Sequence, residues 1–78
     1  MPELTLYYRE GCHLCDHMLA ALAPLQAELG FTVRQRDIDG NAALRERFNE
    51  KVPVLALEDE IICCHFLDEK GLRDTLKS

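Results

Sequence analysis

Apolar residues fall into short strand-like runs and longer stretches with helical spacing along this 78-residue chain. Residues 4–8 form a run of strand-favouring side chains that stops before Gly11, where a turn is expected. From residue 12 to Gly30 the apolar positions recur every three or four residues, which predicts a helix. Pro24 lies inside this stretch, and we expect one kinked helix rather than two. The first third of the chain is therefore predicted as strand, turn and helix.

The remainder continues this alternation. The run that follows Gly30 carries polar residues on both faces by its middle, which favours the edge of a sheet. Asn41 and Asp68 each precede a helical pattern and are candidate helix caps. The predicted elements are strands at residues 4–8, 31–38, 52–57 and 61–64 and helices at residues 12–29, 42–48 and 69–77.

The element order β-α-β-α-β-β-α predicts an α/β fold with a four-stranded mixed sheet flanked by helices. The first two strands are joined through a helix, which favours parallel pairing by a right-handed crossover. The last two strands are separated only by residues 58–60, so they must form an antiparallel hairpin. The length and the 47% apolar content predict a single domain over residues 1–78.

Charge and hydropathy narrow the classes of function. The formal net charge is -5, and no stripe of Lys and Arg is present to displace phosphate counterions, so we expect no nucleic-acid partner. No apolar run approaches the ~20 residues that span a bilayer, and we expect no membrane partner. The chain begins without a basic and then apolar leader, so we expect it in the cytoplasm, where cysteines are thiols, metal ligands or catalytic groups rather than structural disulfides. We also expect a monomer.

The sequence Gly11-Cys12-His13-Leu14-Cys15 carries the clearest chemistry. Two thiols three residues apart at the start of a helix lie on one face, near enough to form a disulfide. Unpaired backbone N–H groups in the first helical turn favour thiolate over thiol, and Cys12 is placed to benefit. This pattern predicts a nucleophilic Cys12 in a redox-active pair.

Other interpretations of the same cysteines remain open. Cys-x-x-Cys is also half of a zinc site, for which further ligands are available in His13, His17, His65, Cys63 and Cys64. We favour redox chemistry, since structural zinc sites usually contain a second Cys-x-x-Cys pair. Cys63 and Cys64 are adjacent on a predicted strand, so they should point to opposite faces, one of them into the core. A third interpretation is an interaction domain whose cysteines do little.

Two motifs together indicate a family. Residues 8–15, Tyr-Arg-Glu-Gly-Cys-His-Leu-Cys, and residues 51–54, Lys-Val-Pro-Val, occur in the order found in the glutaredoxin-like branch of the thioredoxin superfamily, which the chain resembles over residues 4–76. The resemblance implies a thiol-disulfide oxidoreductase without a bound organic cofactor. It implies that Cys12 attacks, that Cys15 resolves the mixed disulfide, and that Val52-Pro53 is a cis peptide beside them whose Val52 backbone contacts the substrate.

The same resemblance implies candidate substrate contacts and partners. Arg9 and Lys51 are candidates to hold a substrate carboxylate, while His13 is either a stabiliser of the thiolate or, as we favour, a passive exposed side chain. Substrates would be a disulfide-containing protein or glutathione, with a reductase or glutathione as electron donor. Glutaredoxins usually carry a Gly-Gly pair after the fourth strand, where this chain has approximately Cys63-Cys64 or Cys64-His65. We therefore expect weak recognition of glutathione.

Overall fold

Four strands and three helices follow one another in the predicted order in the computed structural model, which describes residues 1–77. The strands are β1 (Glu3–Tyr8), β2 (Thr32–Asp37), β3 (Val54–Leu57) and β4 (Glu60–Cys64). The helices are α1 (His13–Leu29), α2 (Ala42–Phe48) and α3 (Glu69–Lys77). Two short 3-10 helices, η1 (Ile38–Gly40) and η2 (Asn49–Lys51), flank α2.

The sheet has the strand order β2-β1-β3-β4. β1 pairs in parallel with β2, whereas β3 is antiparallel to both β1 and β4. The crossover through α1 and the hairpin between β3 and β4 are therefore as predicted, and β2 lies at an edge. The predicted fold class, a thioredoxin-like β-α-β-α-β-β-α arrangement with a four-stranded mixed sheet flanked by helices, is confirmed.

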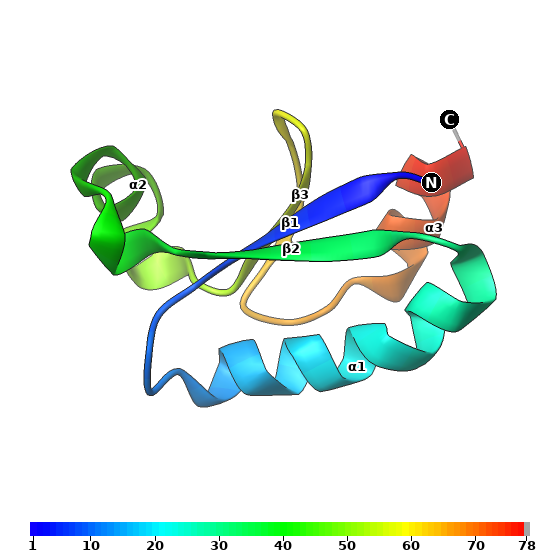
Figure 1. Ribbon diagram of the computed structural model, residues 1–78, viewed down its shortest axis with the longest axis horizontal. Coiled ribbons are helices and arrows are strands. Elements are labelled where there is room, and N and C mark those ends of the chain that lie inside the picture. The colour runs from blue at the N-terminus through cyan, green and yellow to red at the C-terminus, as the bar shows by residue number, and fades with distance from the viewer. Residues whose placement is uncertain (78) are drawn as a thin grey trace.

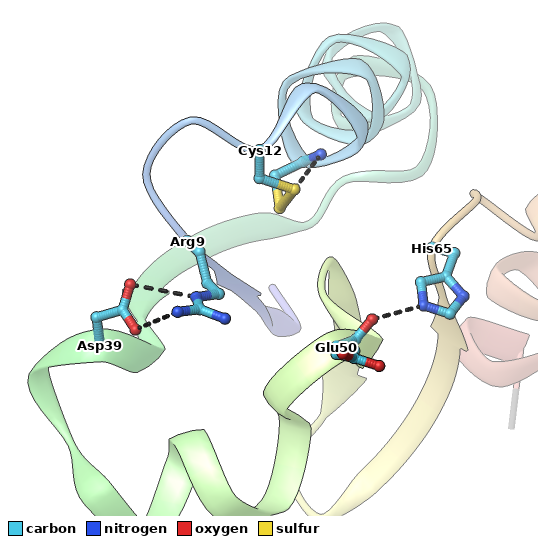
Figure 2. Close-up of a disulfide and its surroundings, with 6 residues drawn as sticks. Arg9, Cys12, Asp39, Glu50 and His65 are labelled. Carbon is cyan, nitrogen blue, oxygen red and sulfur yellow. Dashed lines mark hydrogen bonds and ion pairs between the residues drawn. A yellow bond between two sulfur atoms is a disulfide. The ribbon is translucent and has the colours of Figure 1, made fainter.

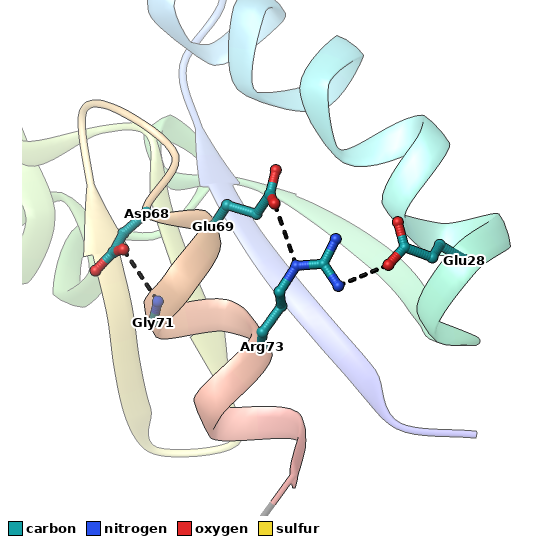
Figure 3. Close-up of polar contacts among 5 residues, drawn as sticks. All are labelled: Glu28, Asp68, Glu69, Gly71 and Arg73. Carbon is teal, nitrogen blue, oxygen red and sulfur yellow. Dashed lines mark hydrogen bonds and ion pairs between the residues drawn. The ribbon is translucent and has the colours of Figure 1, made fainter.

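The helix ends are set by the residues that the sequence pattern indicated. Gly30 ends α1 in a left-handed conformation with φ of 72° and donates its N–H to the Gln26 carbonyl. Asn41 caps α2 through its side chain, which accepts the Leu44 N–H at 3.1 Å. Asp68 accepts the Gly71 N–H at 3.0 Å at the start of α3 (Figure 3). These side-chain bonds satisfy backbone groups that a helix end leaves unpaired.

Two apolar clusters cover the two faces of the sheet, and α1 and α2 lie on opposite sides of it (Figure 1). The larger cluster joins α1 and α3 to β1 and β3, and its buried members are Leu4, Leu6, Met18, Leu22, Leu25, Phe31, Leu55 and Leu72. The smaller cluster contains Ile38, Phe48 and Val54, with Tyr7 packed against it. Alternate strand residues supply the two clusters because successive side chains of a strand point to opposite faces.

A charged contact joins the two helices of the larger face. Arg73 of α3 lies 2.6 Å from a carboxylate oxygen of Glu28 in α1 and also donates to Glu69 at 3.1 Å (Figure 3). The hydrogen bond from Arg73 lowers the pKa of Glu28. Because these side chains are largely exposed, the contact is screened by salt and contributes modestly.

Some boundaries differ from the sequence prediction. β3 begins at Val54 rather than at residue 52, because Pro53 has no N–H to donate to the ladder. A register shift occurs between Leu55 and Ala56 where β3 pairs with β4. From its residue type Phe66 is expected in the core or at its rim, and the structure places it outside the core with 70% of its surface exposed. Within residues 1–77 no helix is long and apolar enough to cross a membrane.

Candidate active site

The Cys-x-x-Cys pair lies where β1 gives way to α1. Gly11 has φ of 74°, a left-handed conformation that favours glycine, and it turns the chain into the helix. Cys12 has extended backbone angles and is the N-cap of α1, while Cys15 lies in the first turn. Their Cα atoms are 5.2 Å apart and their sulfur atoms form a disulfide. The pair is therefore near enough to close, as the spacing predicted.

The two cysteines differ in environment. Cys15 is 4% exposed, whereas Cys12 is half-buried. The Cys15 N–H donates to the Cys12 sulfur at 3.1 Å, so Cys12 takes the place of the usual hydroxyl or carboxylate cap (Figure 2). An amide N–H aimed at a sulfur stabilises the thiolate when the pair is reduced. This arrangement suits Cys12 for attack and Cys15 for resolution.

Arg9 is not a free cation in this structure. Its Nε and a terminal nitrogen contact the two carboxylate oxygens of Asp39 at 3.2 and 3.1 Å (Figure 2). A carboxylate ligand would have to compete with Asp39 for this guanidinium. The sequence did not reveal Asp39 as the partner of Arg9. Parallel pairing of β1 with β2 places Tyr8 opposite Asp37, so the segments that follow the two strands lie at the same end of the sheet.

The second motif lies in the segment that leads into β3. The Val52–Pro53 peptide is cis, as the family resemblance implied. Pro53 is buried and Val52 is half-buried, while Lys51 and His13 are exposed. Val52 packs against the smaller apolar cluster. The roles of these residues toward a substrate stay predictions.

From the sequence, His65 was considered only as a metal ligand or as a replacement for glycine. In the structure it contacts two residues that lie before β3. It follows β4 with φ of 67°, and its N–H donates to the Pro53 carbonyl at 2.8 Å. Its ring nitrogen Nε2 lies 2.9 Å from the Glu50 carbonyl oxygen (Figure 2). His65 therefore ties the loop after β4 to the segment that precedes Val54.

Two pockets adjoin this loop. The η2 pocket, of about 450 Å³, is lined by residues 46–51 and His65. The α1 pocket, of about 270 Å³, is lined by Leu14, His17, Met18 and Ala21 of α1 and by residues 65–67. Leu14 stands between the two cysteines in sequence, and Lys51 immediately precedes Val52. The pockets thus adjoin the helix turn that carries the dithiol and the segment that carries Pro53.

Cys63 and Cys64 point to opposite faces of β4, as predicted. Cys63 packs against the larger cluster and Cys64 against the smaller one, and both are half-buried rather than one being core. Burial raises the pKa of the Cys63 thiol. Among residues 1–77 no three His, Cys, Asp or Glu side chains lie close enough to hold a metal ion, so the additional zinc ligands considered from sequence are not gathered around Cys12 and Cys15.

Comparisons with known proteins agree with this fold. The model of the glutaredoxin-like domain (DUF836) matches residues 3–77. An uncharacterised protein of Mycobacterium tuberculosis is 35% identical over 77 residues, which cover 92% of this chain and 79% of that protein. The solution NMR structure of a Nitrosomonas europaea protein superimposes with a TM-score of 0.87 at 41% identity, covering 96% of this chain and 92% of that one. The crystal structure of an X. campestris protein gives a TM-score of 0.72 at 39% identity, with 95% of each chain covered.

Proposed function

Since the chain belongs to the glutaredoxin-like domain family (DUF836), we propose that it is a thiol-disulfide oxidoreductase that reduces disulfides through Cys12 and Cys15. The observation that carries this proposal is the asymmetry of the pair. Cys12 is partly exposed and receives the Cys15 N–H at 3.1 Å, whereas Cys15 is 4% exposed. An accessible, stabilised thiolate beside a protected second thiol is the arrangement that a two-step exchange needs.

The reaction proceeds in two exchanges. The Cys12 thiolate attacks one sulfur of a substrate disulfide, forming a mixed disulfide and releasing the other substrate sulfur as a thiolate. Cys15 then attacks Cys12, so that the Cys12–Cys15 disulfide closes and the second substrate thiol leaves. The Cα atoms of the closed pair are 5.2 Å apart, within the range that a disulfide bridges. A dithiol or a reductase must then return two electrons to the pair.

Protein disulfides suit this site better than glutathione. The Arg9 guanidinium is already paired with Asp39, which leaves Lys51 as the candidate cation for a ligand carboxylate. An exposed ion pair contributes only about 0–1 kcal/mol, too little to replace a shaped cradle for a small ligand. A protein substrate gains additional contacts around Val52 and Pro53. We therefore propose that the substrates are cytoplasmic proteins with disulfides, and that a reductase or glutathione is the electron donor.

Trapping of the mixed disulfide tests the proposal. Cys15→Ser removes the resolving thiol, so incubation with a small protein disulfide should accumulate an adduct on Cys12 that mass spectrometry detects. Cys12→Ser is the matched control, because it retains a thiol in the same helical turn and should give no such adduct. Equal adducts on both variants would remove the assignment of Cys12 as the attacking group.

A metal-binding module that uses the same two thiols is one of the two alternatives that the sequence left open. Elemental analysis of protein purified under reducing conditions distinguishes it. Stoichiometric zinc that Cys12→Ser abolishes would favour that alternative over disulfide exchange.

A further inference from the structure

We infer, on the basis of the proposed exchange reaction, that Arg9 and Asp39 are a positioning pair, which holds the turn before α1 so that the Cys12 sulfur stays within reach of the Cys15 N–H. The Arg9 side chain extends toward Asp39 and not toward Cys12, so the pair acts through the turn of residues 9–11 (Figure 2). The inference concerns what keeps Cys12 in its reactive position, and not which disulfides it accepts.

The turn between β1 and α1 has few other supports. Glu10 is exposed, and its side chain makes no ion pair or hydrogen bond within the described residues 1–77. An added Cβ at Gly11 would meet no atom within 4 Å, so this residue is not packed against a neighbour. Arg9 therefore supplies the side-chain anchor of the turn, at the position that directly follows β1.

Asp39, on the other side of the contact, is itself held in place. Its N–H donates to the Asp37 carboxylate at 2.9 Å, which caps η1. The intervening Ile38 is fully buried in the smaller cluster. Since Tyr8 pairs with Asp37, Arg9 and η1 leave the sheet at the same end. The Asp39 carboxylate is thus a fixed point to which the turn is attached.

The contact fixes direction as well as distance. Nε and a terminal nitrogen of Arg9 lie 3.2 and 3.1 Å from the two carboxylate oxygens, and such a two-point contact orients the planar guanidinium. At the far end of the turn, Cys12 accepts the Asp16 N–H through its carbonyl at 3.2 Å and the Cys15 N–H through its sulfur at 3.1 Å. Without the anchor Cys12 can move away from both donors, so its thiolate loses part of its stabilisation.

Alkylation of the reduced protein tests the pair. Arg9→Gln and Asp39→Asn each remove the contact, so each should slow the alkylation of Cys12 by iodoacetamide at pH 7 by about threefold, an effect of the size that one exposed ion pair supplies. The double variant should be no slower than either single variant, because both substitutions remove the same contact. Arg9→Lys keeps the charge without the two-point geometry and should give an intermediate rate. Salt of about 0.15 M screens direct effects of charge on the sulfur.

Arg73→Gln is the matched control. It also removes an exposed contact between an arginine and a carboxylate, because Arg73 lies 2.6 Å from Glu28. Glu28 is in the last turn of α1, whereas Cys12 caps the first. This variant should therefore leave the alkylation rate of Cys12 unchanged.

Amide hydrogen exchange followed by NMR gives a second reading that does not depend on thiol chemistry. The amides of Cys15 and Asp16 should exchange faster in Arg9→Gln and Asp39→Asn than in wild type, because both amides donate to Cys12. Arg73→Gln should leave the exchange of these two amides unchanged. Thermal unfolding establishes that each variant is folded before it is compared.

The outcomes are distinguishable. An unchanged alkylation rate in either single variant overturns the inference, and so does equal slowing by Arg73→Gln. Faster alkylation in Asp39→Asn, or slower alkylation with unchanged amide exchange, also overturns it, because the pair would then act on Cys12 through charge rather than position. If the pair controls alkylation but wild type forms no mixed disulfide with a protein disulfide, the proposed exchange function fails and the positioning role stands.

Discussion

Replacing Phe48 by alanine should remove most of the support for the segment that carries Val52 and Pro53. Phe48 is 1% exposed and is the largest member of a cluster with only two other buried residues, Ile38 and Val54. Its ring centroid is 4.5 Å from that of Tyr7. Because η2 and the Val52–Pro53 segment directly follow Phe48, a cavity at this position would loosen that segment.

The expected cost follows from burial. A buried Phe→Ala change costs about 3–5 kcal/mol, which includes the cavity that remains. A domain of 78 residues has a free energy of unfolding of about 4–12 kcal/mol. Phe48→Ala should therefore lower the unfolding temperature by more than about 10 °C. If the free energy of unfolding of the wild type lies at the low end of this range, the variant should be only marginally folded.

Urea denaturation followed by circular dichroism measures this cost. Leu44→Ala is the matched control, because Leu44 is half-buried on the same helix and packs against the same cluster. Its loss should be about 1–2 kcal/mol, in proportion to the smaller buried area. A cost below about 1 kcal/mol for Phe48→Ala, or one no larger than that for Leu44→Ala, would refute the view that this small cluster supports the segment.

Three further predictions concern thiols, charge and backbone. In reduced protein at pH 7, brief iodoacetamide treatment should label Cys12 first by mass spectrometry. Cys63, whose pKa is raised by burial, should react slowly until the pH exceeds the ordinary cysteine pKa of about 8.5. Equal labelling of Cys12 and Cys63 at pH 7 would contradict the assignment of Cys12 as the reactive thiol. The bond from Arg73 lowers the pKa of Glu28, so its stabilisation is present above the ordinary glutamate pKa of about 4.3 and is lost as the pH falls through the lowered folded value. The difference in unfolding temperature between wild type and R73Q should therefore narrow below about pH 4, and a constant difference would argue against an ionic contribution. Gly11→Ala should cost about 1–2 kcal/mol in urea denaturation through its φ of 74° rather than through a clash, because an added Cβ meets no atom within 4 Å, and G11N should cost less.

Local sequence patterns were sufficient to predict most of the architecture. The helix periodicity up to Gly30, the cap at Asn41 and the short link between the last two strands each depend on neighbouring residues, and each is found in the structure. The parallel pairing of β1 with β2 followed from the length of the helical connection. Such features need no knowledge of long-range contacts.

Features that depend on contacts distant in sequence were not predicted. The Arg9–Asp39 pair joins residues 30 positions apart, and the His65 ring reaches back to Glu50 across 15 positions. The exposure of Phe66 also depends on how the loop after β4 leaves the sheet, which an apolar residue type does not reveal. The two cysteines could be located from spacing alone, whereas the groups around them required the folded chain.

Turnover of a protein disulfide by the Cys12–Cys15 pair tests the central claim most directly. The rate is measured with excess dithiothreitol as the reductant, for wild type, Cys12→Ser and dithiothreitol alone. The account predicts that wild type accelerates reduction well above the uncatalysed rate. Cys12→Ser should fall back to that rate, because Cys15 is 4% exposed and Cys63 and Cys64 are half-buried on β4. A wild-type rate no higher than that of dithiothreitol alone, or full activity in Cys12→Ser, would contradict it.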